Sequence, residues 1–516
     1  MKKRHSWLLA TIGIFAAGSV SAQTDSIAQQ IGKLQDQVEV LQREIQRIKA
    51  KVGKAESNAQ PAVAPRAMGK VAAVAPTAIV TMSHDNRPSI CTPDQLNCIA
   101  LTSRLHLDVG GYNYRPATAK TSPQELDDGV NARRARIGVI GKFMGDWDYS
   151  LVYDFGGSAD GFGGLAPGSL PGGGVSGIEQ AWLSYTGFKG IAIEGGYMDS
   201  LYTLDNATSS NDIMFMERSS SAIIANNIAA SDFRSQGGVR GYNDWIWAGA
   251  YFTGPVSGTI HSDTISKTSA PQLAGITTFG QSEQYGSFGR LTLQVLQGPG
   301  YSVHIGGDAE FLLSPPVGPA SPTAIAIRTL ELSDRPELRI DPTTILSTGP
   351  IANVSHAQVY SAEAAAGLGP LFFQGEYFWF KVEREFGLPS LNFNGGYAEA
   401  SWAITGESRK YIPATGAYGG IIPFNPVNPG GTGWGAWEIA GRYSVMNLND
   451  QIGSVAGIAG GQQTVYTAGL NWYVNSNIRF MLNYLHGTIE KQASAVSTVN
   501  TGANFDAIAG RMQIAF

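Results

Sequence analysis

From about Arg104 to the C-terminus, apolar and polar residues alternate along the chain with a period of two. One such apolar face, in WDYSLVYDF, consists of Trp147, Tyr149, Leu151, Tyr153 and Phe155. The same alternation runs through YTAGLNWY (466–473), IRFMLNYLH (478–486) and AIAGRMQIAF (507–516). Because successive side chains of a β-strand point to opposite faces, this pattern predicts β-strands.

Sixteen segments of this kind can be counted. They are 104–115, 131–143, 146–156, 177–187, 190–199, 235–242, 244–254, 284–298, 300–313, 355–368, 370–383, 391–404, 433–446, 464–474, 477–488 and 505–516. A soluble β-sandwich would also alternate, so three further features decide between the two architectures. Aromatic residues recur near the ends of the apolar faces, and short turns such as 144–146 and 474–477 alternate with long Gly/Pro/Ser loops. The chain also ends on the apolar Phe516.

These features favour an all-β fold, a transmembrane antiparallel β-barrel of about 16 strands whose apolar face meets lipid. The segments are close to the 9 to 11 residues that a tilted spanning strand needs. A barrel of this size encloses an aqueous channel rather than a packed interior. The barrel domain is predicted to cover residues 101–516.

The N-terminal residues follow other patterns. Residues 1–22 have a basic start, a short apolar stretch and a small-residue ending, which predicts a secretory signal peptide. In 23–54, apolar residues recur at alternating steps of four and three from Ile27 to Val52, which predicts a coiled-coil helix on the periplasmic side. This seam implies self-association without separating dimer from trimer, and contact of the helix with peptidoglycan stays open. Residues 55–100 are rich in Ala, Pro and Val and are expected to form a linker.

Composition narrows the function. Without Lys2, Lys3 and Arg4, 33 basic residues stand against 41 acidic ones, which argues against a nucleic-acid partner. Cys91 and Cys98, the only cysteines, could close a disulfide in an oxidising periplasm or remain idle thiols. No His lies at ligand spacing beside them, so neither a metal nor another cofactor is expected. The seven His are scattered without a compact catalytic triad, so no enzyme is expected.

If the apolar faces meet lipid, the opposite faces line the lumen. Strand parity places seven arginines there: Arg134, Arg136, Arg240, Arg290, Arg442, Arg479 and Arg511. Guanidinium groups stay charged and offer forked donors, so a ladder of them lowers the barrier for anions in a pore. The alternative is that they pair with the inward acids of the same strands and only organise the wall. Arg133 has the parity of the lipid face, so it must lie at the rim, in a subunit contact or at a β-bulge.

The loop from Met198 to Ser221 is long and mixes polar and aromatic residues, among them Asp212, Glu217 and Arg218. In a barrel of this size it could fold inward and constrict the channel. The alternative is an ordinary surface loop.

Several stretches resemble, in order and spacing, the phosphate-selective porins O and P. They are RRARIGVIGKFMGDWDYSLVYDFGG (133–157), IEQAWLSYTGF (178–188), TSSNDIMFMERS (208–219), AWEIAGRYSVMNLND (436–450), GLNWYVNSNIRFMLNY (469–484) and DAIAGRMQIAF (506–516). The resemblance implies a trimeric sixteen-stranded barrel that passes small anions, with the third long loop inside the pore and Arg133 and Arg134 on the anion path. The chain departs from the family at 195–205, where GGYMDSLYTLD is acidic and the family has a Lys-bearing stretch. This departure favours a general or differently selective pore over strict phosphate selectivity.

The sequence therefore predicts a porin in the outer membrane of a Gram-negative bacterium, a homotrimer surrounded by lipid. Small hydrophilic solutes and ions would diffuse through it passively, with an anion or phosphate preference left open. The alternative is a structural or adhesive outer-membrane protein that uses the coiled coil to contact the cell wall or partners.

Overall fold

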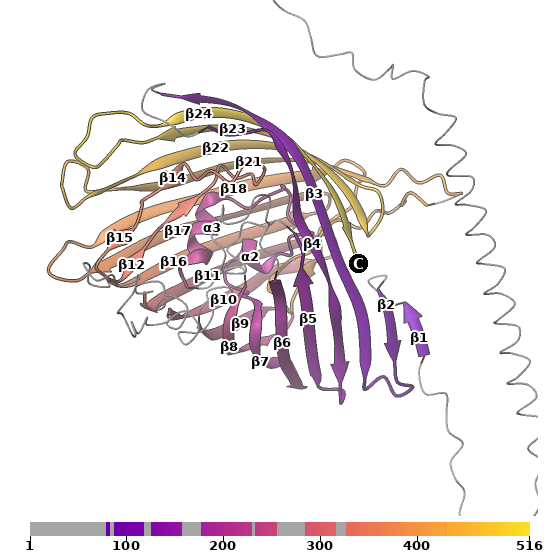
Figure 1. The fold of residues 1–516 in the computed structure, drawn as a ribbon. Coiled ribbons are helices and arrows are strands. Elements are labelled where there is room, and N and C mark those ends of the chain that lie inside the picture. The colour runs from indigo at the N-terminus through magenta and orange to yellow at the C-terminus, as the bar shows by residue number, and fades with distance from the viewer. Residues whose placement is uncertain are drawn as a thin grey trace, which may run out of the picture. The chain divides into compact units, whose positions relative to one another are not determined.

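The computed structural model describes residues 79–82, 87–117, 125–156, 177–229, 233–254, 284–315, 327–428 and 430–516. Sixteen long antiparallel strands of this described part form one ring (Figure 1). The first eight are β3 (Cys98–Pro116), β4 (Gly129–Phe143), β5 (Trp147–Asp154), β6 (Gly177–Phe188), β7 (Ile191–Asp199), β8 (Phe233–Tyr242), β9 (Ile246–Thr253) and β10 (Tyr285–Gly298). The other eight are β11 (Tyr301–Ser314), β16 (Val354–Leu368), β17 (Leu371–Arg384), β18 (Leu391–Ala403), β21 (Ala436–Asp450), β22 (Ile458–Tyr473), β23 (Ile478–Glu490) and β24 (Ala503–Ala515).

The ring closes where its last strand meets its first. β24 pairs with β3 along its whole length, from Ala503 opposite Pro116 to Ala515 opposite Arg104. Figure 1 shows these two strands, yellow and indigo, side by side. The predicted barrel and its sixteen strands are therefore confirmed, with one strand for each predicted segment.

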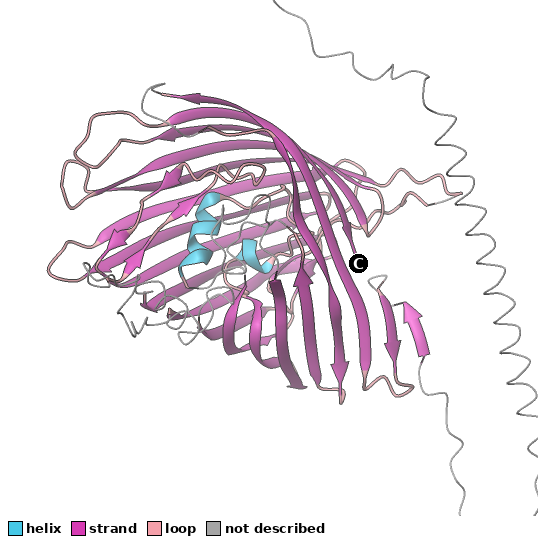
Figure 2. Ribbon diagram, viewed as in Figure 1, coloured by secondary structure: helices cyan, strands magenta, loops and turns pink. Residues whose placement is uncertain are grey.

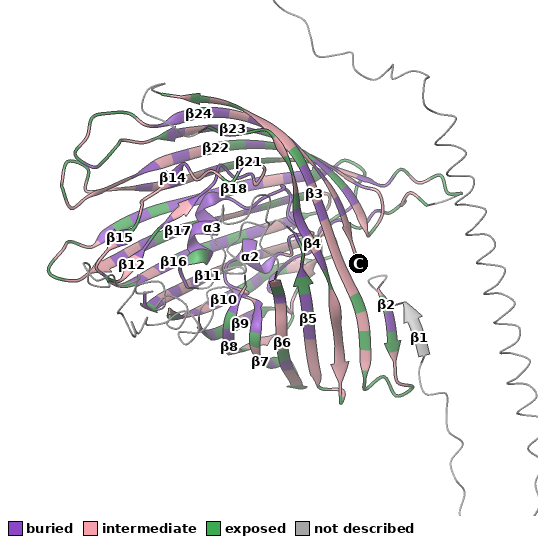
Figure 3. Ribbon diagram, in the orientation of Figure 1, coloured by how far each residue is buried: buried purple, intermediate pink, exposed green. Residues whose placement is uncertain are grey.

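Burial alternates along the strands as the sequence predicted (Figure 3). On β23, Phe480, Leu482 and Tyr484 are exposed on the outer face, whereas Arg479 and Met481 between them are buried inside. The outer face thus offers apolar side chains to lipid, and the inner face holds the polar and charged ones.

Connections at the two ends of the barrel differ in length. Short turns join β4 to β5 and β22 to β23, at the end that also holds the C-terminus, and this arrangement marks the periplasmic end. One connection at this end is long, namely residues 404–435 between β18 and β21, with the short strands β19 (Tyr411–Ile412) and β20 (Ala417–Tyr418). The helices α2 (Leu204–Ala207) and α3 (Ser220–Ile228) belong to the β7–β8 connection and lie inside the ring (Figure 2).

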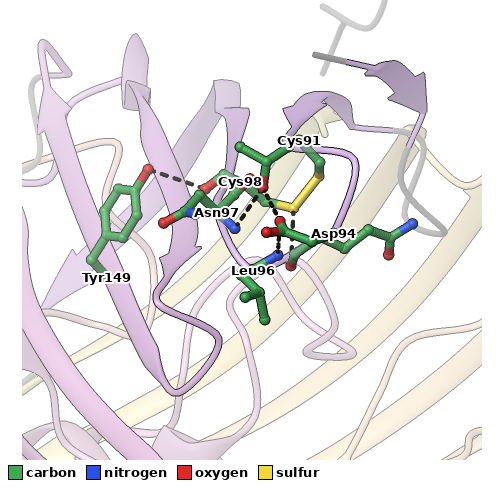
Figure 4. The surroundings of a disulfide bond; sticks show 8 residues. Cys91, Asp94, Leu96, Asn97, Cys98 and Tyr149 are labelled. Carbon is green, nitrogen blue, oxygen red and sulfur yellow. Dashed lines mark hydrogen bonds between the residues drawn. A yellow bond between two sulfur atoms is a disulfide. The ribbon is translucent and has the colours of Figure 1, made fainter. Parts of the chain in front are cut away.

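The C-terminal end of the predicted linker (55–100) contains two short strands. Residues there form β1 (Ile79–Met82) and β2 (Pro88–Cys91), which extend the sheet beside β3, and β3 itself already begins at Cys98. Cys91 and Cys98 are joined by a disulfide (Figure 4).

The predicted signal peptide (1–22), the coiled coil (23–54) and the first part of the linker lie outside the described residues. Among the helices in the part of the chain that is described, none is long and apolar enough to cross a membrane.

Four short strands lie in connections rather than in the ring. β12 (Thr329–Leu330) pairs with β15 (Ile351–Ala352), and β13 (Ser333–Asp334) pairs with β14 (Leu346–Ser347). All four belong to the connection between β11 and β16, whose described residues run from 327 to 353.

Candidate functional site in the barrel lumen

Three connections occupy the lumen and contact the wall. They are the loop with α2 and α3, called here the constriction loop (residues 200–229), the described part of the β11–β16 connection (327–353), and the first half, about 407–421, of the long periplasmic turn (404–435). The constriction loop is almost wholly buried, so it is not an ordinary surface loop. Its α3 begins after Ser219, whose hydroxyl accepts a hydrogen bond from the Ala222 amide, a standard N-cap.

Arg133 lies at a β-bulge. His106 of β3 pairs with Arg134, but the next residue, Leu107, pairs with Ala132, so the register skips Arg133. The extra residue of a bulge can turn a side chain to the other face. Arg133 accordingly points inward and is only 1% exposed. Strand parity left three possibilities for Arg133, namely the rim, a subunit contact or a β-bulge, and the structure shows the β-bulge.

The Arg133 guanidinium binds Glu217 of the constriction loop. Its Nε and Nη2 lie 2.8 and 3.1 Å from the two carboxylate oxygens. Nη2 of Arg511 lies 2.8 Å from Glu217 Oε1, and Arg511 also binds Asp108 of β3 at 2.6 and 2.7 Å. Burial alone would raise the pKa of Glu217, but Arg133, Arg511 and Arg134 hold it well below its usual range. Glu217 is therefore a fixed negative charge between β4 and β24.

Most of the predicted lumenal arginines are paired with carboxylates. The pairs are Arg133–Glu217, Arg136–Asp154, Arg240–Glu194, Arg290–Glu363, Arg442–Glu337 and Arg511–Asp108. The contacts of these six arginines match the alternative in which lumenal arginines pair with inward carboxylates and organise the wall.

Two predicted arginines differ from the other six. The guanidinium of Arg134 contacts the ring nitrogen Nδ1 of His106 at 3.4 Å. Arg479 donates to the carbonyls of Asn211, Ile213 and Met214 in the constriction loop. Among the described residues neither forms an ion pair with a carboxylate.

Arg104 behaves in the same way and was not among the predicted residues. It donates to the hydroxyls of Ser210 at 2.6 Å and Ser209 at 3.2 Å, and it has no ion pair within the described ranges. Strand parity could have placed Arg104 in the lumen, because Arg104 and His106 have the same parity as the inward Asp108. We call Arg104, Arg134 and Arg479 the unpaired cations. They lie on β3, β4 and β23, and β24 completes this wall between β23 and β3.

The wall formed by β11, β16 and β17 is acidic. Oxygens of Asp308, Glu363 and Glu376 lie within 4.8 Å of one another, and no other group in the described ranges is close enough to share a cation. Arg290 already contacts two of them, at 2.9 Å from Glu363 and 3.4 Å from Asp308. Glu376 accepts hydrogen bonds from the amides of Leu204 and Asp205 and so fixes the start of α2.

The long periplasmic turn was missed as a lumenal segment. Its Arg409 binds Glu438 of β21 at 2.9 Å and donates to the carbonyl of Asp212. Its carbonyls at Thr415 and Gly416 accept hydrogen bonds from Arg290. The length of this connection could have pointed to its role, because turns at the periplasmic end of such barrels are otherwise short.

The β11–β16 connection supplies further charges. Glu337 accepts hydrogen bonds from Ser444 of β21 and from the amide of Ser220 at the start of α3. Arg339 binds Asp334 at 2.9 Å and lies 3.9 Å from Glu217. The constriction loop is therefore held from the barrel wall and from a second loop.

The remaining predicted loop residues have different surroundings. Arg218 donates to the carbonyls of Asp205 and Thr208 and so braces the loop internally. Asp212 lies beside Gly420 of the long periplasmic turn. Burial raises the pKa of Asp212, an effect that Arg409, Arg479 and Arg104 offset only in part.

We expect Asp212 to make ion flow through the lumen sensitive to pH. Below its raised pKa the carboxyl is neutral, and above it the lumen gains a negative charge that opposes anions. The chloride-to-potassium permeability ratio should therefore rise as the pH is lowered from neutral toward the ordinary aspartate value of about 4. Reversal potentials in a KCl gradient at several pH values measure this change. Asp212→Asn should keep the high ratio and lose most of the dependence, while Asp244→Asn in an exposed turn should behave as wild type; equal slopes in all three would contradict the assignment.

Comparisons with known proteins agree with this architecture. The family model described as phosphate-selective porin O and P matches residues 99–516. The chain is similar to an uncharacterized protein of Caulobacter vibrioides, 23% identical over 92% of this chain and 90% of that protein. It is also similar to Porin O of Pseudomonas aeruginosa, 24% identical over 83% and 90%.

Solved structures that resemble the chain are less similar in sequence. The trimer form of the outer membrane protein OmpT of Vibrio cholerae is 11% identical, with a TM-score of 0.46 over 81% of this chain and 99% of that one. The outer membrane channel DcaP of Acinetobacter baumannii is 9% identical, with a TM-score of 0.42 over 81% and 97%.

Proposed function

This chain belongs to the phosphate-selective porin O and P family, and from this premise we propose that its channel prefers small anions. As a member of that family it is a porin of the outer membrane of Gram-negative bacteria, a channel for passive diffusion. Family and fold point to a channel rather than to catalysis. The finer statement, the sign of its selectivity, rests on the charges in the lumen.

One observation carries the proposal. The unpaired cations Arg104, Arg134 and Arg479 stand on one wall, whereas carboxylates gather on the wall of β11, β16 and β17. An ion pair presents little net charge to a passing solute, but a guanidinium whose partners are hydroxyls, carbonyls or an imidazole keeps its positive charge without a neighbouring carboxylate to cancel it. Low-dielectric walls focus such a field along the channel. An anion therefore has a favourable track along the basic wall.

The class of anion is broader than phosphate. The stretch 195–205 has no lysine or arginine in this chain. It therefore lacks the cations that would favour a multiply charged anion over chloride or a monocarboxylate, since the Coulomb energy scales with the charge. We propose a channel for small anions in general.

We also propose that the porin is a homotrimer. The heptad pattern of 23–54 supports self-association, and the family resemblance supports the number three. Chemical crosslinking of the full-length mature protein in its membrane should give a trimer band, and a protein that stays monomeric would contradict this part of the proposal.

The test of anion preference is the reversal potential of the purified porin in a planar bilayer with a KCl gradient. Wild type should favour chloride. Arg134→Gln should lower the chloride-to-potassium ratio about threefold, since a unit charge about 7 Å from an ion in water changes its energy by about 0.6 kcal/mol. The variant should fold normally, because the lost cation leaves no carboxylate without a partner.

Arg384→Gln is the matched control. Its guanidinium binds the carbonyls of Pro389 and Ala456 at the opposite, extracellular end, so its ratio should equal that of wild type. A wild-type porin that favours potassium would overturn the anion preference.

A further inference from the structure

A polar cavity lies between the barrel wall and the long periplasmic turn, at the periplasmic end of β10, β11 and β16. It has a volume of about 510 Å³, within the range of about 300 to 1,000 Å³ that is typical of ligand pockets. The polar residues that line it include Gln294, Gln297, Ser302, Ser408, Lys410 and Tyr411. No carboxylate is among its lining residues.

A β-bulge in β10 brings both glutamines to this cavity. Gln294 pairs with His304, but the next pair is Leu296 with Val303, so the register skips one residue. On a regular strand, two residues three positions apart would point to opposite faces. The bulge instead places Gln297 on the inner face together with Gln294, opposite the inward Ser302.

The amide of Gln294 is buried without a partner. Its side chain lines the cavity and the residue is only 5% exposed, and none of the described residues forms a hydrogen bond with its amide group. A buried amide left unmatched is unfavourable, and it offers both N–H donors and an acceptor oxygen. A hydroxyl group can both donate and accept, so a hydroxylated solute suits this position.

Lys410 supplies the charge. Its exposed side chain lines the cavity and forms no ion pair with any residue of the described ranges. The neighbouring Arg409 is neutralised by Glu438 at 2.9 Å. Glu363, on the inner face of β16, is bound by Arg290 at 2.9 Å. The uncompensated charge facing the cavity is therefore that of the Lys410 ammonium.

We propose that this cavity binds a hydroxylated monocarboxylate, the chemistry of a sugar acid. Lys410 binds the carboxylate through a charge-assisted hydrogen bond, and the amides of Gln294 and Gln297 bind the hydroxyl groups. The nitrogen of Gln297 already donates to the carbonyl of Asp244 at 3.3 Å, so Gln297 contributes its oxygen. The inference rests on the proposed anion preference and names a class of solute for it.

Both walls of the cavity are held in place before a solute arrives. The hydroxyl of Tyr411 on the long periplasmic turn lies 3.2 Å from Nδ1 of His304 on β11. The hydroxyl of Ser302 lies 3.0 Å from that of Tyr418, on the same turn. At the rim, a Cβ added to Gly300 or Gly369 would meet no atom within 4 Å. The site is thus preformed, and its rim leaves room for a solute.

The experiment measures how D-glucuronate blocks the ion current of the purified full-length porin in a planar bilayer, with KCl held constant. A solute bound at the periplasmic mouth narrows the path of the ions, so the current of wild type should fall to a plateau. Gln294→Leu keeps the size of the side chain and removes its hydrogen-bonding groups, so the half-blocking concentration should rise about fivefold. Lys410→Gln, at an exposed position, removes the charge and should raise it by a similar factor, about fivefold.

Two matched controls repeat these changes outside the cavity. Gln358→Leu alters a glutamine on the outer face of β16, and Lys189→Gln alters a lysine in the exposed turn between β6 and β7, at the same end of the barrel. Both should keep the half-blocking concentration of wild type. D-glucose has the hydroxyl groups without the carboxylate, so it should block wild type only at a concentration about fivefold higher, and Lys410→Gln should not change its effect. Circular dichroism checks that each variant has the β-sheet content of wild type.

The outcomes separate the site from the proposed function. If D-glucuronate leaves the wild-type current unchanged, or blocks Gln294→Leu and Gln358→Leu at the same concentration, the binding site is overturned. If D-glucose blocks wild type as well as D-glucuronate does, the role of Lys410 is overturned. If wild type favours potassium in a KCl gradient but D-glucuronate still blocks it through Gln294 and Lys410, the general anion preference fails and the binding site stands.

Discussion

Replacing Glu217 by glutamine is expected to destabilise the folded protein by about 3 kcal/mol or more and to raise the chloride-to-potassium ratio. Breaking a buried ion pair from one side leaves its partner charged and unsolvated, which typically costs about 3 to 5 kcal/mol. Here two guanidinium groups lose their shared carboxylate, since Arg133 and Arg511 both lie 2.8 Å from it. Glutamine keeps the shape and one acceptor oxygen, so the change isolates the charge.

Urea unfolding in detergent micelles measures the stability, and bilayer reversal potentials measure the ratio. Glu490→Gln at the exposed end of β23 is the matched control and should change neither quantity. An unfolding midpoint of Glu217→Gln equal to that of this control would show that Glu217 does not hold the loop to the wall.

Replacing Arg290 by glutamine is the second large change, and it should shift selectivity in the opposite direction. Arg290 neutralises Glu363 and Asp308, and it also donates to the carbonyls of Leu201, Thr415 and Gly416. One side chain thus joins the wall to the constriction loop and to the long periplasmic turn. Its loss should cost about 3 to 5 kcal/mol, favour potassium, and raise single-channel conductance as both segments loosen.

Two companion variants show whether charge or bracing dominates. Arg290→Lys restores the charge but offers a single nitrogen in place of the guanidinium fork, so the ratio should recover while the conductance stays high. Arg290→Gln/Glu363→Gln removes the carboxylate as well and should recover part of the lost stability. If Arg290→Gln alone has the conductance of wild type, Arg290 does not hold the constriction loop and the long periplasmic turn in place.

Strand parity could be predicted because it follows from local covalent geometry. The apolar and polar faces of β23, from Phe480 to Tyr484, needed only alternation and the cost of placing charge in lipid. Arg133 could not be assigned in this way, because a bulge of one residue depends on its partner strand and on Glu217 from a distant loop. On β4, parity therefore placed Arg134 and Arg136 inside the barrel, whereas only the tertiary structure showed where Arg133 points.

The filling of the lumen was the harder part. Arg409 and Glu337 lie in connections that have no period, so parity could not place them. Their partners Glu438 and Arg442 lie on β21, where parity places both side chains inside the barrel but gives no sign of the loops that neutralise them. Sequence alternation thus located the inward charges, but whether a charge faces water or a loop depends on long-range contacts.

The ion pair between Arg511 and Asp108 crosses the seam where the ring closes, and its two residues are 403 positions apart in the chain. Glu217 binds Arg511 on one side of this seam and Arg133 on the other. Closing so long a loop carries a large entropic cost, and contacts between distant residues tend to form late in folding. The constriction loop thus acts as an internal clasp for the first and last strands. A mutation that retunes this cluster for a new solute will therefore also change how readily the barrel assembles.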